Sequence, residues 1–181
     1  MIALRRQRGM TLIELVMFVV IVAVGVAGIL SVLNVTVLRS ADPLVQKQAQ
    51  ALAEGLLEEI QTGYFAYCDG ADEQLKYAKT YTDCDSGGDT YGPETDETRP
   101  YNTVKDYASA ANTATALATV LPGEAAVAAP AGYAATVTIG PAALGNIAQA
   151  VDGDALLIRV VVTSGSTQAI AEGFKTRQVP Q

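Results

Sequence analysis

The sequence predicts an α+β fold in which one long helix packs against a small antiparallel sheet. Two observations near the N-terminus indicate the helix. An almost uncharged run is long enough to span a membrane, and the segment after it repeats apolar residues at helical spacing. The last third of the chain carries runs of strand-favouring residues separated by turn residues. Helix and strands therefore occupy separate parts of the chain, as in the α+β class.

The first element is an apolar helix over residues 10–33. This run carries one charged side chain, Glu14, and at a rise of about 1.5 Å per residue it would cross a hydrocarbon core of about 30 Å. The segment before it contains three arginines, Arg5, Arg6 and Arg8. Positive charge holds a flanking segment in the cytoplasm. We therefore expect one transmembrane helix, with residues 1–9 on the cytoplasmic side and the rest of the chain facing outward.

The same run admits a second interpretation, a secretory signal that is cleaved off. Gly25-Val26-Ala27 before Gly28 resembles the small-residue site at which such a signal ends. Glu14 argues against this interpretation, because an unpaired carboxylate at mid-membrane costs about 2.5 to 3.5 kcal/mol on insertion scales. A signal that is removed after export would gain nothing from a carboxylate in its apolar run.

The helix is expected to continue as an amphipathic segment over residues 34–62. Its apolar residues recur at four- and three-residue steps, at Val45, Ala49, Leu52, Leu56 and Ile60. Asp42-Pro43 marks a helix start or a kink in a longer helix, and we expect a kink. Gly63 supplies the stop. The stripe predicts that this half packs onto a globular head formed by residues 63–181.

Cys68 and Cys84 are the only cysteines, and both fall on the exported side, where disulfides form and persist. We predict that they are bonded. The bond would close the loop between them and stabilise the head by about 3 kcal/mol in the chain-entropy treatment. A catalytic or metal-binding pair is the alternative, but neither a CxxC spacing nor a histidine is present.

The acidic segment 83–94 matches part of an EF-hand calcium loop. Carboxylates occupy the first, third and twelfth positions of that pattern, and Gly88 occupies the sixth. The candidate calcium ligands are Asp83, Asp85, Asp89 and Glu94. Gly87 replaces an acid at the fifth position, and Cys84 would be bonded inside the loop. A solvated acidic loop without a metal is the alternative. We expect no other cofactor.

Three strands are predicted in the last third of the chain, over residues 133–139, 155–163 and 168–175. A turn at 164–166 joins the last two into a hairpin. The segment 107–131 has no steady period and is expected to form loop or short irregular helix. The three strands would form an antiparallel sheet whose apolar face receives the apolar stripe of the helix.

Charge and composition exclude several functions. The chain carries 12 Lys and Arg against 19 Asp and Glu, a net charge of -7, and contains no histidine. A nucleic-acid-binding protein needs a basic face to displace phosphate counterions, so we expect no nucleic-acid partner. Without histidine, no Ser/His/Asp, Cys/His or HExxH site can be built. We therefore expect that the protein is not an enzyme and assign no catalytic residue.

Residues 8–15, Arg-Gly-Met-Thr-Leu-Ile-Glu-Leu, resemble the class III leader of type IV pilins and pseudopilins. The resemblance implies that a prepilin peptidase cleaves between Gly9 and Met10, that Met10 is then N-methylated, and that the membrane helix is retained. It also implies that Thr11 and Glu14 serve assembly. The carboxylate of Glu14 would pair with the freed amine of Met10 on a neighbouring subunit. The alternative is that Glu14 snorkels to the membrane interface.

A second resemblance covers residues 34–37, 40–60, 67–69 and 101–107, which look like those of MshD-type minor pilins of the mannose-sensitive haemagglutinin (MSHA) pilus. This implies the type IV pilin fold and a minor pilin that contributes to pilus assembly and surface attachment. A type II secretion pseudopilin would share the leader and the helix. An adhesin or ligand-binding module, mounted on a pilus and acting through residues 69–97, is a third possibility.

The resemblance also implies a location and partners. The chain would be stored in the inner membrane as a single-pass protein with its head in the periplasm, and would then enter an extracellular pilus. Its partners would be the other pilins of the filament, major and minor, together with the prepilin peptidase and the inner-membrane assembly platform.

Overall fold

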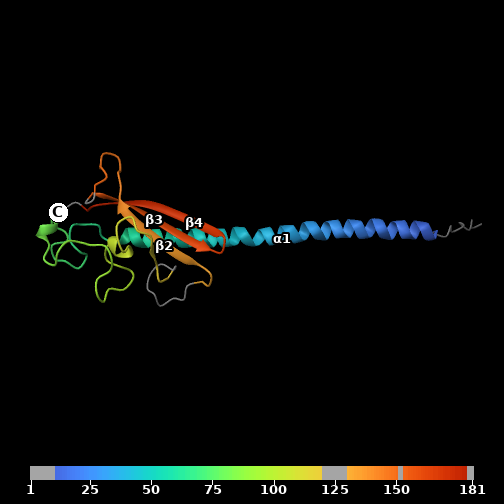
Figure 1. Cartoon of the computed structure of the whole chain (residues 1–181), viewed down its shortest axis with the longest axis horizontal. Helices are drawn as coiled ribbons and strands as arrows, with labels where there is room; N and C mark the ends of the chain where they lie inside the picture. The colour runs from blue at the N-terminus through green and yellow to red at the C-terminus, as the bar shows by residue number, and fades with distance from the viewer. Residues whose placement is uncertain (1–10, 120–129, 151–152, 179–181) are drawn as a thin grey trace, which may run out of the picture. The chain divides into compact units, whose positions relative to one another are not determined.

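The structure is a computed structural model that describes residues 11–119, 130–150 and 153–178, without the side chains of 34–42. Its helix α1, Leu12–Thr62, is assigned as one continuous helix with Pro43 inside it (Figure 1). The chain divides into two compact units, Met1–Pro43 and Leu44–Gln181. The C-terminal part of α1, from Leu44, therefore belongs to the same unit as the head.

In the first unit, α1 presents apolar side chains on all its faces. Residues Leu12–Leu33 have a mean hydropathy of 2.9 and form a helix long and apolar enough to cross a membrane. None of this window is buried inside the protein. A helix that is apolar all round needs either lipid or other protein chains as its surroundings.

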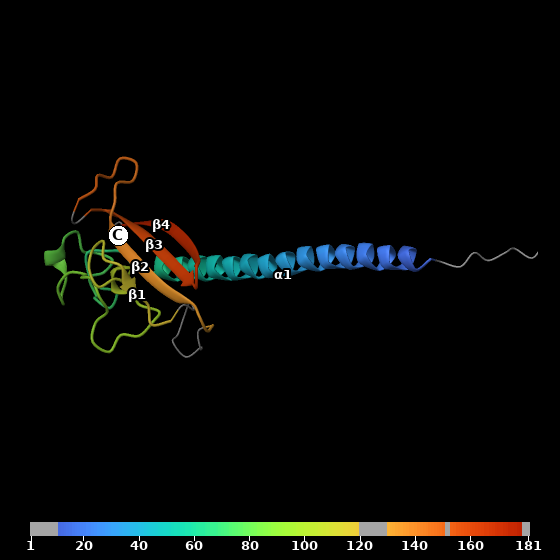
Figure 2. The same ribbon diagram turned by 45° about the vertical axis from the view of Figure 1, so that its right-hand side comes forward.

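The second unit contains a four-stranded antiparallel sheet in the order β1-β2-β3-β4 (Figure 2). Its strands are β1 Thr115–Ala116, β2 Ala134–Pro141, β3 Ala155–Ser164 and β4 Thr167–Thr176. The predicted α+β class is confirmed, and the three predicted strands are present within one or two residues of their expected bounds. The expectation for 107–131 was wrong in part, because β1 adds a short fourth strand there. Residues 120–129 of that segment lie outside the described residues.

The β3–β4 hairpin closes with a two-residue turn. Ser164 pairs with Thr167, and Gly165 between them has a φ of 57°. A positive φ suits glycine, and the twist of such a turn matches that of paired strands. The turn predicted at 164–166 is therefore confirmed.

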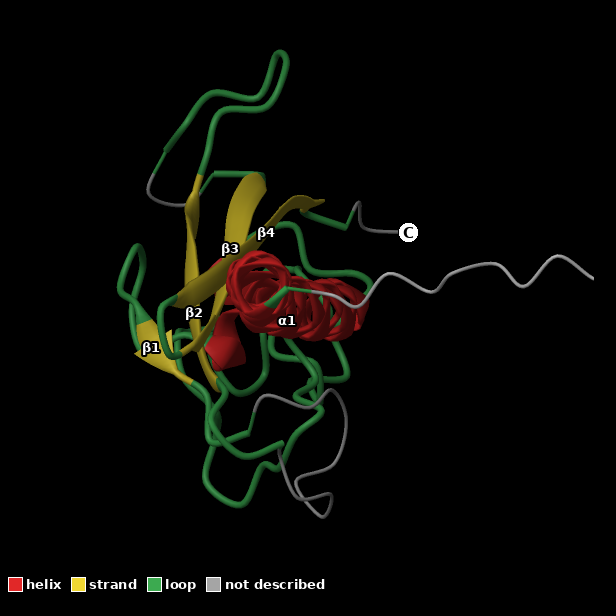
Figure 3. Cartoon of the chain, turned by 90° about the vertical axis from the view of Figure 1, so that its right-hand side faces the viewer, coloured by secondary structure: helices red, strands yellow, loops and turns green. Residues whose placement is uncertain are grey.

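The core of the second unit lies between α1 and the sheet. From Leu44 onward, α1 runs along one face of β2, β3 and β4 (Figure 3). Its fully buried apolar residues are Ala49, Ala53, Leu56 and Ile60. The predicted stripe is confirmed at Ala49, Leu56 and Ile60, whereas Val45 and Leu52 are only partly buried and Ala53 was not predicted. Two small alanines at that point let the helix backbone approach the sheet closely.

The helix ends where the sequence predicted. The N–H of Gly63 donates to the carbonyl of Ile60 at 3.1 Å, and the ammonium of Lys175 in β4 donates to the carbonyl of Gln61 at 2.6 Å. A Cβ at Gly63 would stand 3.0 Å from the backbone of Thr103, so the chain passes too close for a larger residue. A cation on the last carbonyls is a favourable end for a helix.

Candidate functional site

The surface that bears on assembly is the first turn of α1 and the apolar helix behind it. Thr11 directly precedes the helix, and its carbonyl accepts a hydrogen bond from the N–H of Leu15 at 3.2 Å. Glu14 lies exposed in the first turn, where a negative charge is favoured by the helix dipole. Gly9 and Met10 lie outside the described residues. Glu14 is the only charge on Leu12–Leu33 and has no ion pair within the described part of the chain.

The apolar residues behind Glu14 are heavily exposed, with 65% of Phe18 and 69% of Val24 accessible. An exposed apolar surface of this size marks contact with lipid or protein. Gly25 and Gly28 have nothing within 4 Å of an added Cβ, so both are open to a neighbouring helix. This unit therefore offers an exposed apolar surface for packing, with one charged side chain on it, that of Glu14.

In the head, the predicted disulfide between Cys68 and Cys84 is present, across a sequence separation of 16. Asp72 lies within the loop that the disulfide closes, and it binds the segment that follows Cys84. Its Oδ2 accepts hydrogen bonds from the N–H groups of Asp85 and Ser86 at 3.0 and 3.1 Å. These bonds, with one from the N–H of Gln74, lower the pKa of Asp72. Disulfide and carboxylate together fix the course of the loop.

Removing the disulfide should lower the stability of the head. We expect the Cys68→Ala, Cys84→Ala double variant to unfold with a free energy about 2–5 kcal/mol lower than that of the parent, because the open loop gains entropy in the unfolded chain. Urea unfolding of the full chain in mild detergent, followed by tyrosine fluorescence, measures this difference. A double variant as stable as the parent would show that Asp72 alone holds the loop.

The four residues predicted to ligate calcium as one loop are not brought together. The Oδ2 of Asp83 accepts from the N–H groups of Lys79 and Thr80 at 2.8 and 2.9 Å, which lowers the pKa of Asp83. Asp89 is buried against a lysine, and Glu94 lies beside Asp69 and Asp106. Matching an EF-hand spacing does not ensure its geometry, because no helix flanks this loop to aim the carboxylates at one point.

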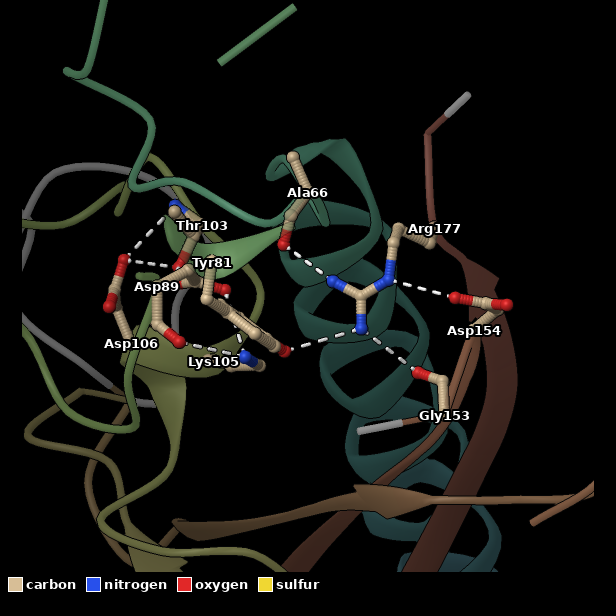
Figure 4. Close-up of polar contacts among 9 residues, drawn as sticks. All are labelled: Ala66, Tyr81, Asp89, Thr103, Lys105, Asp106, Gly153, Asp154 and Arg177. Atoms are coloured by element: carbon tan, nitrogen blue, oxygen red, sulfur yellow. Dashed lines mark hydrogen bonds and ion pairs between the residues drawn. The ribbon is translucent and has the colours of Figure 1, made fainter. Parts of the chain in front are cut away.

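Asp89 pairs instead with Lys105. The Nζ of Lys105 lies 3.4 Å from the Oδ2 of Asp89 and donates to its carbonyl at 2.8 Å (Figure 4). The hydroxyl of Thr103 donates to the Oδ1 of Asp89 at 3.0 Å. Burial nevertheless raises the pKa of Asp89 to about 6, because desolvation outweighs these favourable contacts. The ammonium of Lys105 also lies 5.4 to 5.9 Å from three aromatic ring centres, those of Phe65, Tyr81 and Tyr91.

Arg177, just past β4, ties the end of the chain to the loops. Its guanidinium donates to the carbonyl of Ala66 at 2.8 Å and to the Oδ1 of Asp154 at 3.0 Å (Figure 4). It also lies over the rings of Phe65 and Tyr67, at 4.5 and 4.2 Å from their centres. An arginine that stacks and forms ion pairs in this way is a structural anchor.

A second buried ion pair, that of Arg99 and Glu59, joins the helix to the loops. The guanidinium of Arg99 donates two hydrogen bonds of 2.9 Å to the carboxylate of Glu59, on the buried face of α1. The hydroxyl of Tyr107 donates to the same carboxylate at 2.7 Å, and this contact together with burial raises the pKa of Tyr107. Arg99 also donates to the carbonyl of Thr119 at 2.8 Å. Glu59 thereby fastens two loop segments to the helix.

A cluster of oxygen atoms lies beyond these pairs, formed by Asp69, Glu94, Glu97, Asn102 and Asp106. Carboxylate oxygens of Asp69, Glu94 and Asp106 all lie within 4.8 Å of one another. Burial and the neighbouring charges of Glu97 and Glu94 raise the pKa of Asp106 to about 7. Sequence analysis missed this cluster because its members come from three segments whose spacing follows no known pattern.

The head also has a cavity of about 530 Å³ between Lys105 and Arg177. Aromatic rings of Phe65, Tyr81 and Tyr91 line it. Pockets that are mostly apolar with a few convergent polar groups are common small-molecule sites.

Comparison with known protein families finds a match at the N-terminus of the chain. Residues 4–30 match the family described as the prokaryotic N-terminal methylation motif. The match supports a protein of the type IV pilin or pseudopilin kind, which is structural and not enzymatic, and this leader implies processing by prepilin peptidase and assembly with other pilins. No curated protein and no solved structure matched the chain.

Proposed function

We propose that the chain is a prepilin that is cut between Gly9 and Met10, N-methylated at Met10 and assembled as a minor subunit of an MSHA-type pilus. The observation that carries the proposal is the methylation motif at 4–30, which includes most of the apolar stretch Leu12–Leu33, a stretch of helix with none of its window buried. A helix of that kind needs a membrane before assembly and neighbouring subunits after it. The choice of a minor, MSHA-type subunit rests on the resemblance of residues 34–60 and 101–107.

Glu14 gives the proposal its physical mechanism. Cleavage after Gly9 frees a positively charged amine at Met10, four residues before Glu14. A carboxylate held in an apolar assembly is costly unless it meets a positive charge. In a filament of parallel helices, the amine of one subunit meets the carboxylate of the next, and this pairing sets their axial register.

The same reasoning predicts how the protein moves from the inner membrane into the filament. Before assembly the apolar helix spans the inner membrane, with the arginine-rich N-terminus in the cytoplasm and the head in the periplasm. The assembly platform then moves the subunit into an extracellular filament with the other pilins. The disulfide of Cys68 and Cys84 suits an oxidising compartment such as the periplasm.

Processing is tested by expressing the full chain with and without a prepilin peptidase and measuring its intact mass without reduction. We expect the peptidase to yield a chain that begins at N-methylated Met10 and is lighter by two hydrogen atoms than the dithiol form. Gly9→Arg is the matched control and should stay uncut, because the peptidase site requires a small residue. A chain that begins at Gly28, or wild type that keeps Met1 in the presence of the peptidase, would overturn the proposal.

Experiments can also distinguish the proposed pilin from a pseudopilin and from a ligand-binding module. A pseudopilin would be processed in the same way but would enter the filament of a type II secretion system, so the presence of the mature chain in sheared surface pili favours the pilin. A ligand-binding role of the head is favoured by one observation, the cavity of about 530 Å³ lined by aromatic rings and by Lys105. Substituting Tyr91 with Ala should abolish surface attachment without changing piliation if the cavity binds the receptor.

A further inference from the structure

The oxygen cluster of Asp69, Glu94, Glu97, Asn102 and Asp106 belongs to the second unit and contains no residue of the apolar helix that the proposed function uses. It joins three parts of the head. Asp69 follows the disulfide residue Cys68, Glu94 and Glu97 lie in the next loop, and Asp106 lies in the short helix η2, Lys105–Tyr107. Anything bound between them would tie the disulfide loop to η2.

Three of these carboxylates are arranged in the same way, with one oxygen fixed by the chain and the other left over. The Oδ1 of Asp69 accepts from the N–H of Ala71 at 2.8 Å. The Oε1 of Glu97 accepts from the N–H of Asn102 at 2.9 Å. The Oδ2 of Asp106 accepts from the N–H of Thr103 at 3.0 Å and competes with Asp89 for the single proton of the Thr103 hydroxyl, which lies 2.8 Å away. These bonds hold the carboxylates in place, as outer partners do for metal ligands.

The second oxygen of each of these groups is buried and has no hydrogen-bond partner among the described residues. These atoms are Oδ2 of Asp69, Oε2 of Glu97 and Oδ1 of Asp106, and the side-chain oxygen of Asn102 joins them. Asp106 is only 2% exposed. A buried polar atom without a partner costs free energy, and this cost is largest for a charged group. Unpartnered buried oxygens beside the close set of Asp69, Glu94 and Asp106 favour the binding of a cation there.

The cluster also lacks a balancing charge. The carboxyl groups of Asp69, Glu94 and Asp106 lie together, Glu94 is within hydrogen-bonding reach of Glu97, and no ion pair reaches any of the four within the described part of the chain. The nearby Lys105 is occupied by Asp89. Repulsion of this kind is offset by a cation placed among the carboxylates.

We propose that Asp69, Glu94 and Asp106, with Glu97 and Asn102, bind a calcium ion. All candidate ligands are oxygen atoms, which selects a hard cation. The three carboxylates lie within 4.8 Å of one another, close enough for one ion at about 2.3–2.6 Å from each oxygen to bind all three. Ca²⁺ accepts about six to eight oxygen ligands in a flexible geometry, whereas Mg²⁺ demands a near-ideal octahedron and usually keeps several waters, so we assign Ca²⁺.

This site differs from the loop that the sequence suggested. It shares only Glu94 with the set Asp83, Asp85, Asp89 and Glu94. Asp83 caps backbone N–H groups and Asp89 is paired with Lys105, so neither faces the cluster as a free ligand. Two substitutions in the same acidic segment therefore separate the two sites, one at Glu94 and one at Asp85.

Calcium binding is measured on the full-length protein in mild detergent, by terbium luminescence sensitised by tyrosine and by the shift of Tm between EDTA and added CaCl₂. Terbium replaces calcium at oxygen sites, and Tyr101 and Tyr107 flank the cluster in sequence. We expect terbium to bind and calcium to displace it with an affinity of about 10⁻⁴–10⁻³ M, as in extracellular calcium modules. Calcium should also raise the Tm, and magnesium should do so less.

Substitutions of single residues test which side chains bind the ion. Glu94→Gln should weaken calcium binding by at least about tenfold, and Asp106→Asn should do the same while keeping an oxygen for Thr103. Asp85→Asn is the matched control and should bind calcium as the parent does. If Asp106→Asn misfolds, Glu94→Gln still decides, because Glu94 lies at the edge of the cluster and is exposed. No terbium signal and no calcium-dependent Tm shift would overturn the proposal, and so would binding that survives Glu94→Gln but is lost in Asp85→Asn. None of these measurements depends on leader processing.

Discussion

Replacing Arg99 with Met is expected to lower the free energy of unfolding of the head by about 3–5 kcal/mol. Arg99 donates two hydrogen bonds to Glu59, and both side chains are almost completely buried, at 4% and 6% exposed. Methionine matches much of the volume of arginine but leaves the carboxylate of Glu59 buried without its cation. The hydroxyl of Tyr107 would still donate to this carboxylate, but a neutral donor does not replace the charge of a guanidinium.

The pair of Arg159 and Glu172 on β3 and β4 offers a matched control. Their charged atoms lie 3.5 Å apart, but the two side chains are 48% and 50% exposed. Arg159→Met should therefore cost less than about 1 kcal/mol. Urea unfolding of both variants, as full chains in mild detergent and at a fixed calcium concentration, measures the difference. If Arg99→Met and Arg159→Met lowered the free energy of unfolding equally, burial would not make the pair of Arg99 and Glu59 more stabilising than the exposed pair.

A second control tests whether the cost comes from the stranded charge. The double variant Glu59→Leu, Arg99→Met removes both charges, and we expect it to be more stable than Arg99→Met alone, because replacing a whole buried ion pair by apolar groups is often close to neutral. A double variant less stable than Arg99→Met would instead assign the main role to the hydrogen bonds with Tyr107 and Thr119.

The elements that could be predicted from the sequence are those that a local pattern specifies. The helix up to Thr62 follows from apolar spacing and the stop at Gly63, and the β3–β4 hairpin follows from two strand-favouring runs around Gly165. The disulfide followed from there being only two cysteines on the exported side. For the helix and the hairpin, the information lies within one segment of the chain. For the disulfide, only one pairing of the two cysteines is possible.

What the sequence did not reveal depends on partners far apart in the chain. Glu59 was not recognised as a buried residue because a charge beside Ile60 looks like the polar edge of a stripe, and its partner Arg99 is 40 positions away. The segment of β1, Thr115–Ala116, is too short to show alternation, and its strand character comes only from pairing with β2. The spacing of segment 83–94 allowed a calcium loop as one of two interpretations, and it could not show that Asp89 pairs with Lys105, 16 positions away.

Replacing Glu14 with Leu is expected to leave cleavage after Gly9 intact and to reduce incorporation into the filament by at least about 100-fold. Leucine at this position fits a membrane helix better than glutamate does, so insertion and storage in the membrane should not suffer. In the filament, however, the amine of Met10 on the neighbouring subunit would be left in an apolar setting without its carboxylate. Stranding one partner of a buried pair costs about 3–5 kcal/mol, and about 1.4 kcal/mol corresponds to a factor of ten.

The measurement is a quantitative blot of sheared pili and of the membrane fraction, with the intact mass of the membrane-held chain as the readout of processing. Val16→Ala is the matched control: Val16 is 45% exposed on the same helix and carries no charge, so its loss should change incorporation little. If Glu14→Leu enters pili as well as Val16→Ala does, the carboxylate does not set the register, and apolar packing along Leu12–Leu33 is sufficient for assembly. If Glu14→Leu is also left uncut, the carboxylate acts earlier, in recognition by the peptidase, because a charge needed only between subunits has no role before the leader is removed.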